Sequence, residues 1–169
     1  MSTNSRYDFS MGTKLANDLQ VEAWMAFHAI RVTVIPPLAR HLSEHCGLSE
    51  AEYQVFIGLR STPEMELKPS QLAEELGWEM GRLSHQISRM ETKGLLIRKQ
   101  CPVDARSCFI GMTKKGKALI DKALPLQLKE VKRLFGDALT NQQMKNLIEI
   151  SEAVVEHVTR AKTRETTTK

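Results

Sequence analysis

The chain has 169 residues, of which 41% are hydrophobic and 26% charged, and its formal net charge is +4. This length fits one domain with an added oligomerisation element, and no apolar run approaches the roughly 20 residues that a membrane span requires. We expect no signal peptide in the polar N-terminus, and three cysteines without a secreted-scaffold pattern indicate a reducing compartment. Together these features predict a soluble, cytoplasmic protein.

The first predicted helix covers residues 17–46, where apolar side chains recur mostly at three- and four-residue spacing. Pro36 and Pro37 interrupt this pattern. Proline lacks the amide hydrogen of a helical bond and disfavours helical geometry in the residue before it. We therefore expect a bend, or two separate pieces, near Ile35.

Ser49 and Glu52 form a capping-box pattern at the start of a second helix, which Thr62 and Pro63 end. The residues expected to face inward there, directly or through their neighbours, are Tyr53, Phe56, Ile57 and Leu59. A short extended segment at 66–68 then leads into a third helix.

The third helix is short and is followed closely by a fourth. Pro69 begins the third helix and Gly77 ends it, and the fourth helix covers residues 79–93 before Gly94. A β-hairpin over residues 94–113 follows, because two short apolar runs bracket the turn-prone segment PVDARS. This order of elements is the layout of a winged helix-turn-helix.

Residues spaced at 100° along the fourth helix separate into two faces. The apolar stripe consists of Met80, Leu83, Ile87 and Met90. The opposite face consists of Gly81, Arg82, His85, Ser88, Arg89 and Thr92. Small residues permit close approach, and Arg and His donate hydrogen bonds to guanine and phosphate oxygens in a major groove. An ordinary solvated face would mix Glu and Lys pairs, so this face favours groove recognition.

Positive charge is concentrated in one quarter of the chain. Residues 79–119 contain nine Lys or Arg and three acidic residues, a net charge of +6, whereas the remainder has a net charge of −2. A focused basic patch is typical of proteins that bind a phosphate backbone. On charge alone, a merely solvated basic face remains an alternative.

Two long helices are predicted after the hairpin. Thr113 is placed to cap a helix that runs to about Phe135, with a bend expected at Pro125. Thr140 and Gln143 form another capping box. The last helix has an apolar face formed by Met144, Leu147, Ile148, Ser151, Val154, Val155 and Val158. Since a monomer would expose this face, we expect a dimer.

The chain resembles the MarR family of bacterial transcription regulators. The resemblance rests on GLSEAEYQVFIGL (47–59), PSQLAEELG (69–77), RMETKGLLIRK (89–99), DARS (104–107) and MTKKGKAL (112–119). Met90 and Met112 stand where the family usually has Leu. The resemblance implies a homodimer with intertwined terminal helices that binds a palindromic double-stranded DNA operator. It also implies repression relieved by a small ligand or an oxidant.

The predicted fold class is mainly α with a small β-hairpin wing, a winged helix-turn-helix with N- and C-terminal dimerisation helices. The predicted parts are a flexible arm (1–16), a dimerisation helix (17–46), the DNA-binding domain (47–116), C-terminal dimerisation helices (117–162) and a flexible tail (163–169).

Three groups of residues are predicted to contact DNA. The recognition-helix group is Arg82, Ser84, His85, Ser88 and Arg89. The wing group is Asp104, Arg106 and Ser107, and the phosphate group is Ser70, Gln71, Lys93 and Lys99. In the wing, Arg106 is expected to enter a narrow A·T-rich minor groove. Asp104 is expected to orient its guanidinium, because a carboxylate matches that fork of donors.

An effector pocket is suggested by the resemblance, since family effectors often sit between the dimer helices and the DNA-binding lobe. Its predicted lining is Trp24, Phe27, His28 and Arg31, with Arg31 holding the anionic group of a small aromatic or anionic ligand. Core packing or the dimer seam explains Trp24 and Phe27 equally well. We expect no cofactor.

The cysteines and histidines offer two further alternatives. Cys101 and Cys108 flank the wing tip, and their oxidation would deform it, although Cys also serves as a small hydrophobic residue. His41 and His45 have metal-ligand spacing, but no second cluster completes a tetrahedral site, so no metal site is predicted.

An enzyme is not indicated, because the sequence has no Gly-rich phosphate loop, nucleophile elbow or recognisable pair of catalytic acids. Two alternatives to a ligand-released repressor remain: a thiol-based redox sensor of the same fold, and a winged-helix module that binds proteins rather than DNA. The second predicts an acidic or apolar outer face on the fourth helix.

Overall fold

The computed structural model describes residues 18–100 and 108–167. The chain divides into two compact units, Met1–Pro36 and Pro37–Lys169. Helix α1 (Asp18–Cys46) continues through Pro36 and Pro37, so the two prolines do not split it into separate helices. The boundary between the compact units nevertheless falls between these two residues.

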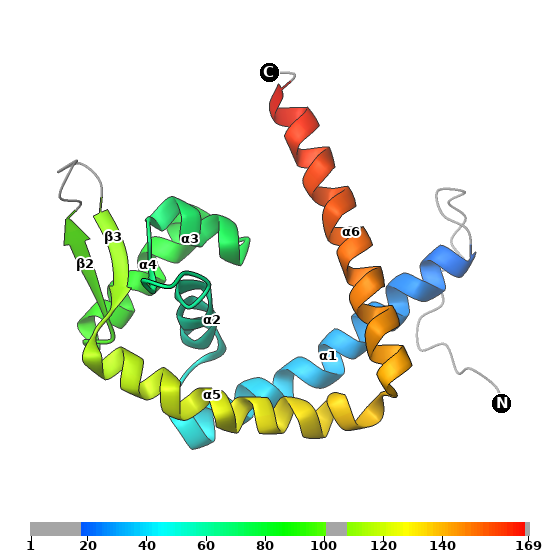
Figure 1. The fold of residues 1–169 in the computed structure, drawn as a ribbon, viewed down its shortest axis with the longest axis horizontal. Helices are drawn as coiled ribbons and strands as arrows, with labels where there is room; N and C mark the ends of the chain where they lie inside the picture. Colours follow the sequence, from blue (N-terminus) through cyan, green and yellow to red (C-terminus); the bar gives the residue numbers. More distant parts are fainter. Residues whose placement is uncertain (1–17, 101–107, 168–169) are drawn as a thin grey trace. The chain divides into compact units, whose positions relative to one another are not determined.

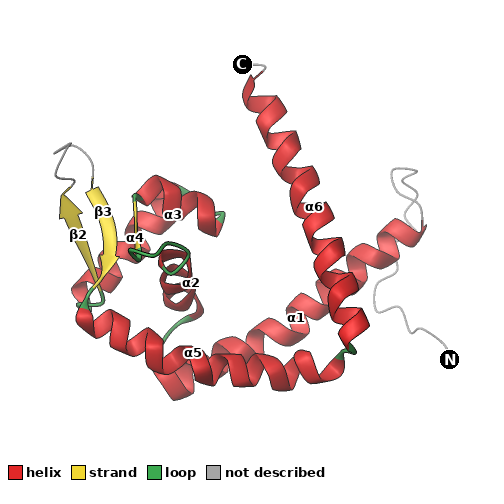
Figure 2. Ribbon diagram, in the orientation of Figure 1, coloured by secondary structure: helices red, strands yellow, loops and turns green. Residues whose placement is uncertain are grey.

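The second unit contains a winged helix-turn-helix (Figures 1 and 2). Its helices are α2 (Glu50–Leu59), α3 (Pro69–Leu76) and α4 (Met80–Thr92), and its strands are β1 (Glu66–Leu67), β2 (Leu96–Gln100) and β3 (Cys108–Met112). The strands pair antiparallel in the order β1-β3-β2, with Arg98 opposite Ile110. The predicted hairpin is therefore confirmed, and the short extended segment adds a third strand to it.

Local sequence signals fix where the helices begin and end. The Ser49 backbone N–H donates to Glu52 Oε2 at 2.8 Å, and the Glu52 N–H donates to Ser49 Oγ at 3.3 Å, as the capping box requires. Thr113 Oγ1 accepts from the Gly116 N–H at 3.0 Å and caps the next helix. Gly77 ends α3 with a φ of 61°, a left-handed conformation that suits a residue without Cβ.

One hydrophobic core holds the winged unit together. Its buried members are Leu48, Val55, Phe56, Leu59, Leu72, Ala73, Leu83, Ile87, Met90, Leu95, Leu96, Ile110, Ile120 and Ala123. Two residues that were predicted to face inward are exposed to solvent instead: Ile57 is 38% exposed and Met80 is 46% exposed. Val55 is buried in α2, whereas Met80 is the first residue of α4, at the margin of the core.

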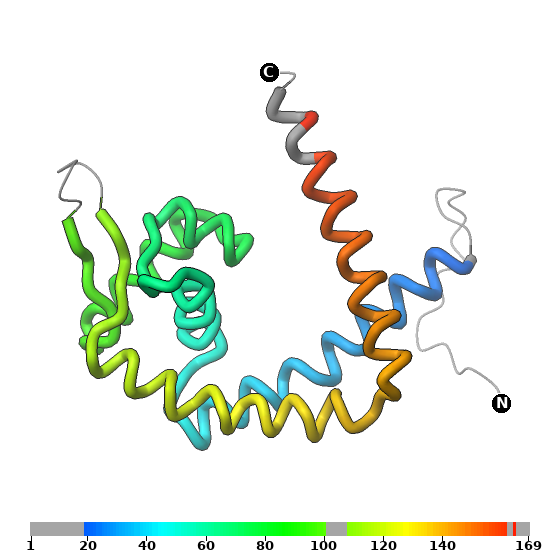
Figure 3. The backbone as a smooth tube through the Cα atoms, in the orientation of Figure 1, coloured from blue at the N-terminus to red at the C-terminus, as the bar shows by residue number. Residues whose placement is uncertain are grey.

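Two long helices follow the sheet. Helix α5 (Lys114–Leu134) is unbroken at Pro125, and α6 (Asn141–Thr167) begins after a short 3₁₀ turn, η1 (Gly136–Ala138), where the chain changes direction sharply (Figure 3). Arg60 Nη1 donates to Asp121 Oδ1 at 2.6 Å, which links the end of α2 to α5. In the described part of the chain, no helix is long and apolar enough to cross a bilayer.

Candidate nucleic-acid interface

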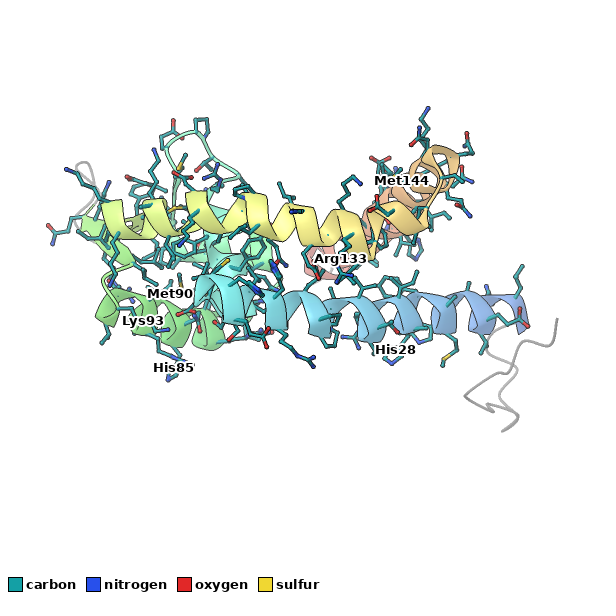
Figure 4. The ribbon with its side chains drawn as sticks, turned by 90° about the horizontal axis from the view of Figure 1, so that it is seen from below. His28, His85, Met90, Lys93, Arg133 and Met144 are labelled. Atoms are coloured by element: carbon teal, nitrogen blue, oxygen red, sulfur yellow. The ribbon has the colours of Figure 1, made fainter. Side chains whose placement is uncertain are left out.

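Helix α4 has a buried face and an exposed face, as the sequence predicts. Leu83, Ile87 and Met90 are at most 1% exposed. All five residues predicted to read DNA are exposed: Arg82, Ser84, His85, Ser88 and Arg89. Figure 4 shows His85 projecting from the outer side of the winged unit, with Met90 turned toward its interior. The outer face is thus basic, contains small residues and is accessible to a large partner.

The short connection between α3 and α4 sets the position of this face. Helix α3 packs against α2 and α4, and Leu72 and Ala73 fix it to the core. Ser70 and Gln71, two of the predicted phosphate ligands, are exposed in the first turn of α3. The Gln71 side chain accepts a hydrogen bond from the Lys68 backbone N–H at 3.1 Å through Oε1, which leaves its amide hydrogens for another acceptor.

Sequence reasoning missed Trp78, which lies in the connection between α3 and α4. The Arg82 guanidinium carbon is 3.9 Å from the centroid of the Trp78 ring. Trp78 is partly buried against the core. The signal available in the sequence was the four-residue spacing of an aromatic and an arginine at the start of a helix.

Several basic side chains near the interface already have acidic partners. Lys93 Nζ donates to Glu52 Oε1 at 2.5 Å, and Arg98 Nε donates to Glu91 Oε2 at 3.1 Å. Lys99 is paired with Glu66. Two predicted phosphate ligands, Lys93 and Lys99, are therefore engaged in ion pairs that a phosphate would have to share or replace. Their side chains are about half exposed, so the ammonium groups stay within reach of solvent.

The carboxylate of Glu52 is the most enclosed acidic group at this junction, with 3% of the residue exposed. Burial by itself raises the pKa of Glu52, but hydrogen bonds from Lys93 and from the Ser49 backbone and side chain outweigh burial and leave the pKa below its usual value. Glu52 therefore remains ionised and joins the start of α2 to Lys93, the residue that caps the end of α4.

The predicted wing residues Asp104, Arg106 and Ser107, together with Cys101, lie outside the described residues. The strands on both sides are described, and Gln100 at the end of β2 is paired with Cys108 at the start of β3. The proposed roles of the wing residues therefore stay predictions.

The predicted effector residues occupy one stretch of α1. The rings of Trp24 and Phe27 are 5.8 Å apart and tilted by 37°, and Arg31 Nη2 lies 3.5 Å from His28 Nδ1. Trp24 is 63% exposed and Phe27 is 56% exposed. Within α1, the structure thus brings together two aromatic rings and, one turn on, two nitrogen-rich side chains (His28 is labelled in Figure 4).

The two histidines with metal-ligand spacing have other partners. The rings of His41 and His45 stack with centroids 4.4 Å apart. His41 Nδ1 lies 3.3 Å from Oε1 of the buried Gln127, which also approaches the Leu38 carbonyl through Nε2 at 3.5 Å. Among the residues described, no group of three or more His, Cys, Asp or Glu side chains is arranged to hold a metal ion.

The winged unit is similar to known regulators in both sequence and structure. A family model described as MarR family matches residues 48–108. An uncharacterized HTH-type transcriptional regulator of Bacillus cereus (strain ATCC 10987 / NRS 248) is 31% identical over 110 residues, 65% of this chain and 71% of the relative. The chain belongs to the MarR family.

Solved structures of transcriptional regulators match most of the chain, and the first two below are described as MarR family. AbsC from Streptomyces coelicolor has a TM-score of 0.79 and 27% identity, over 86% of this chain and 98% of AbsC. Sco3205 from the same organism, solved in complex with DNA, has a TM-score of 0.78 and 26% identity, over 85% and 93% of the two chains. The organohalide-sensing regulator RdhR-CbdbA1625, in its 2,4-dichlorophenol-bound form, shares the fold at 19% identity and a TM-score of 0.73, over 89% of each chain.

These likenesses confirm the predicted family and the mainly helical winged fold. The family and the relatives are transcriptional regulators rather than enzymes, as the sequence indicated. This MarR-family chain is, by homology, a DNA-binding transcriptional regulator. The α4 face described above is the part of it whose shape and charge suit a major groove.

Proposed function

We propose that this MarR-family chain is a homodimeric repressor that binds a palindromic operator and is released by a small-molecule effector. The observation that supports the dimer most directly is the apolar face of α6. Ile148 is 58% exposed, Val154 59% and Val155 64%. Residues at this spacing line one side of a helix, and a contiguous apolar surface of this kind is typical of a protein interface.

Dimerisation explains why the proposed operator is palindromic. A two-fold axis relates two winged units, so each recognition helix meets the same half-site and the operator repeats with inverted orientation. In each half, α4 enters the major groove through Arg82, Ser84, His85, Ser88 and Arg89. Asp104, Arg106 and Ser107 reach the adjacent minor groove, and the phosphate group (Ser70, Gln71, Lys93 and Lys99) sets the register.

The effector part of the proposal rests on α1. Trp24 and Phe27 offer an exposed aromatic surface, and Arg31 offers a fork of donors for an anionic group. In RdhR-CbdbA1625, a regulator of the same fold, 2,4-dichlorophenol is bound. We therefore propose a small aromatic or anionic effector for this chain, with repression relieved when it binds.

Two alternative functions have less support. Burial raises the pKa of the Cys46 thiol, and the nearby charge of Lys122 offsets this increase only in part. The reactive thiolate is therefore disfavoured at this cysteine. A redox sensor would therefore depend on the Cys101 and Cys108 pair at the wing. A protein-binding winged module would need an acidic or apolar α4 surface, whereas the exposed face is basic.

The experiment that tests the proposal combines sedimentation with a gel shift. The full chain should sediment as a dimer without DNA and should retard a duplex taken from its own promoter region. A chain cut after Gly136 lacks α6 and should lose both properties. A stable monomer that still binds the duplex with full affinity would contradict the proposal.

A further inference from the structure

The contact between Trp78 and Arg82 gives the recognition helix a feature that the proposed function does not use. The guanidinium carbon of Arg82 lies 3.9 Å from the ring centroid, well inside the roughly 6 Å range in which a cation is attracted by an aromatic face. Because Arg82 is in the first turn of α4 and Trp78 precedes that helix, the contact spans the joint of the helix-turn-helix.

Trp78 is the fixed member of the pair. Its backbone N–H donates to the Ala73 carbonyl at 2.9 Å, which ties it to the end of α3. Its side chain packs against the buried core of the winged unit. Arg82, by contrast, is exposed. The aromatic ring is therefore a platform whose position is set by the domain, and the guanidinium rests on it.

Arg82 also differs from three basic side chains nearby. Arg98, Lys93 and Lys99 each pair with a carboxylate, whereas no ion pair of Arg82 occurs among the described residues. A guanidinium stacked on a ring uses its face and leaves its five N–H donors at the edge. Those donors match the O6 and N7 acceptors of guanine, which an arginine contacts in bidentate fashion.

We propose that Trp78 is a positioning residue for sequence recognition: it holds the Arg82 guanidinium in one orientation, so that Arg82 reads a guanine in the major groove. This rests on the proposed function, in which α4 enters that groove. A flexible arginine loses rotamer freedom on binding, and prior stacking lowers that cost. Trp78 itself touches no base; it acts through Arg82.

The test begins by selecting duplexes from random-sequence DNA with the wild-type protein. Each selected G·C pair is then replaced in turn by A·T, and affinities are measured for wild type, Arg82→Gln, Trp78→Leu, Trp78→Phe and the two Arg82→Gln double variants. Arg82→Gln should relax the preference at one G·C pair. Trp78→Leu should relax the preference at the same pair, by about two- to fivefold, the range expected for an exposed cation–π contact.

Trp78→Phe should lie between wild type and Trp78→Leu, because phenylalanine offers a weaker aromatic face. In the Arg82→Gln background, neither Trp78 variant should cause a further loss, since there is no guanidinium left to position. Thermal melting of each variant separates a folding defect from this effect. If Trp78→Leu does not fold, the cycle with Trp78→Phe gives the same comparison.

Two results would overturn the positioning role while leaving the proposed function intact: an equal loss on every duplex, or a Trp78 effect that persists undiminished in the Arg82→Gln background. Either would make Trp78 a packing residue only. A wild-type protein that selects no sequence at all would instead overturn the proposed DNA readout, and the positioning role with it.

Discussion

Gly116 and Leu95 are in such close contact that no side chain fits between them. A Cβ atom at Gly116 would lie 2.1 Å from the Leu95 carbonyl oxygen and 3.2 Å from Cε1 of the buried Phe56. Thr113 reinforces the contact, because its hydroxyl donates to the Gly94 carbonyl at 2.7 Å. The first turn of α5 is thus pressed against the start of the sheet.

Gly116→Ala should therefore destabilise the winged unit by about 2–3 kcal/mol or more, since neither the Leu95 backbone nor the buried ring can move freely. The measurement is the free energy of unfolding from urea denaturation. Gly81→Ala is the matched control: it lies inside α4 with open space around its Cβ position, and it should stabilise by roughly 0.5–1 kcal/mol. Equal effects of the two substitutions would contradict the close packing.

Glu52 should make stability depend on pH. Because its folded-state pKa is lowered, its contribution is fully present above the unfolded pKa of about 4.3 and is lost as pH falls through the folded pKa. Glu52→Gln should cost about 1–2 kcal/mol at pH 7, and the difference from wild type should shrink below about pH 4. Glu64→Gln removes the same charge from an exposed position and should change stability little at either pH.

The proposed dimer predicts that one charge on the apolar face of α6 is enough to separate the protomers. Val155→Asp should shift sedimentation toward monomer and weaken operator binding at least tenfold, since a buried unpaired carboxylate is costly. Asn146→Asp introduces the same charge at an exposed polar position of the same helix and should leave the dimer intact. A dimer that tolerates Val155→Asp would place the interface elsewhere.

DNA affinity should fall steeply with salt. A protein that neutralises several phosphates loses orders of magnitude in affinity between about 50 and 200 mM salt. If Arg89 contacts a phosphate, Arg89→Ala should reduce the slope of log affinity against log salt by about 1 and weaken all sequences alike. If Arg89 contacts a base, Arg89→Ala should instead relax the sequence preference at one base pair of the operator. Lys129→Ala removes an exposed charge from α5 and should change neither quantity.

The wing prediction concerns Arg106 and Asp104. Arg106→Ala should weaken binding mainly to operators with A·T-rich flanks, where a narrow minor groove concentrates negative potential. Asp104→Ala should act in the same direction but more mildly, and the two losses combined should be less than additive because Asp104 acts through Arg106. Affinities measured on operators with A·T and G·C flanks check this. Equal losses on both kinds of operator would contradict a minor-groove role for Arg106.

Short-range signals predicted the elements of this fold well. The hydroxyl of Thr140 accepts from the Gln143 N–H at 3.2 Å, as its sequence pattern required, and the capping box at Ser49 is formed in the same way. Such contacts lie within four residues, so the local sequence determines them. The buried stripe of α4 was predicted for the same reason.

The sequence predicted burial wrongly at positions whose environment is determined by residues far away in the chain. A helical wheel treats a helix as endless, but Met80 is the first residue of α4 and is 46% exposed at the margin of the core. The wheel also cannot show which side of α2 its neighbours cover, which is why Ile57 was misplaced. The ion pair between Lys93 and Glu52 joins residues 41 positions apart, and no local sequence pattern predicts it.

The strand order β1-β3-β2 has a consequence for the behaviour of the protein in solution. Strand β2 is an outer strand, bonded on one side to β3, and it exposes Ile97. An open, apolar edge invites another chain to add a strand, and positively charged side chains on such an edge oppose this aggregation. Arg98 and Lys99 occupy that position. Alanine at both sites would lower solubility as well as charge, so Lys99→Gln is the sounder choice for separating DNA binding from self-association.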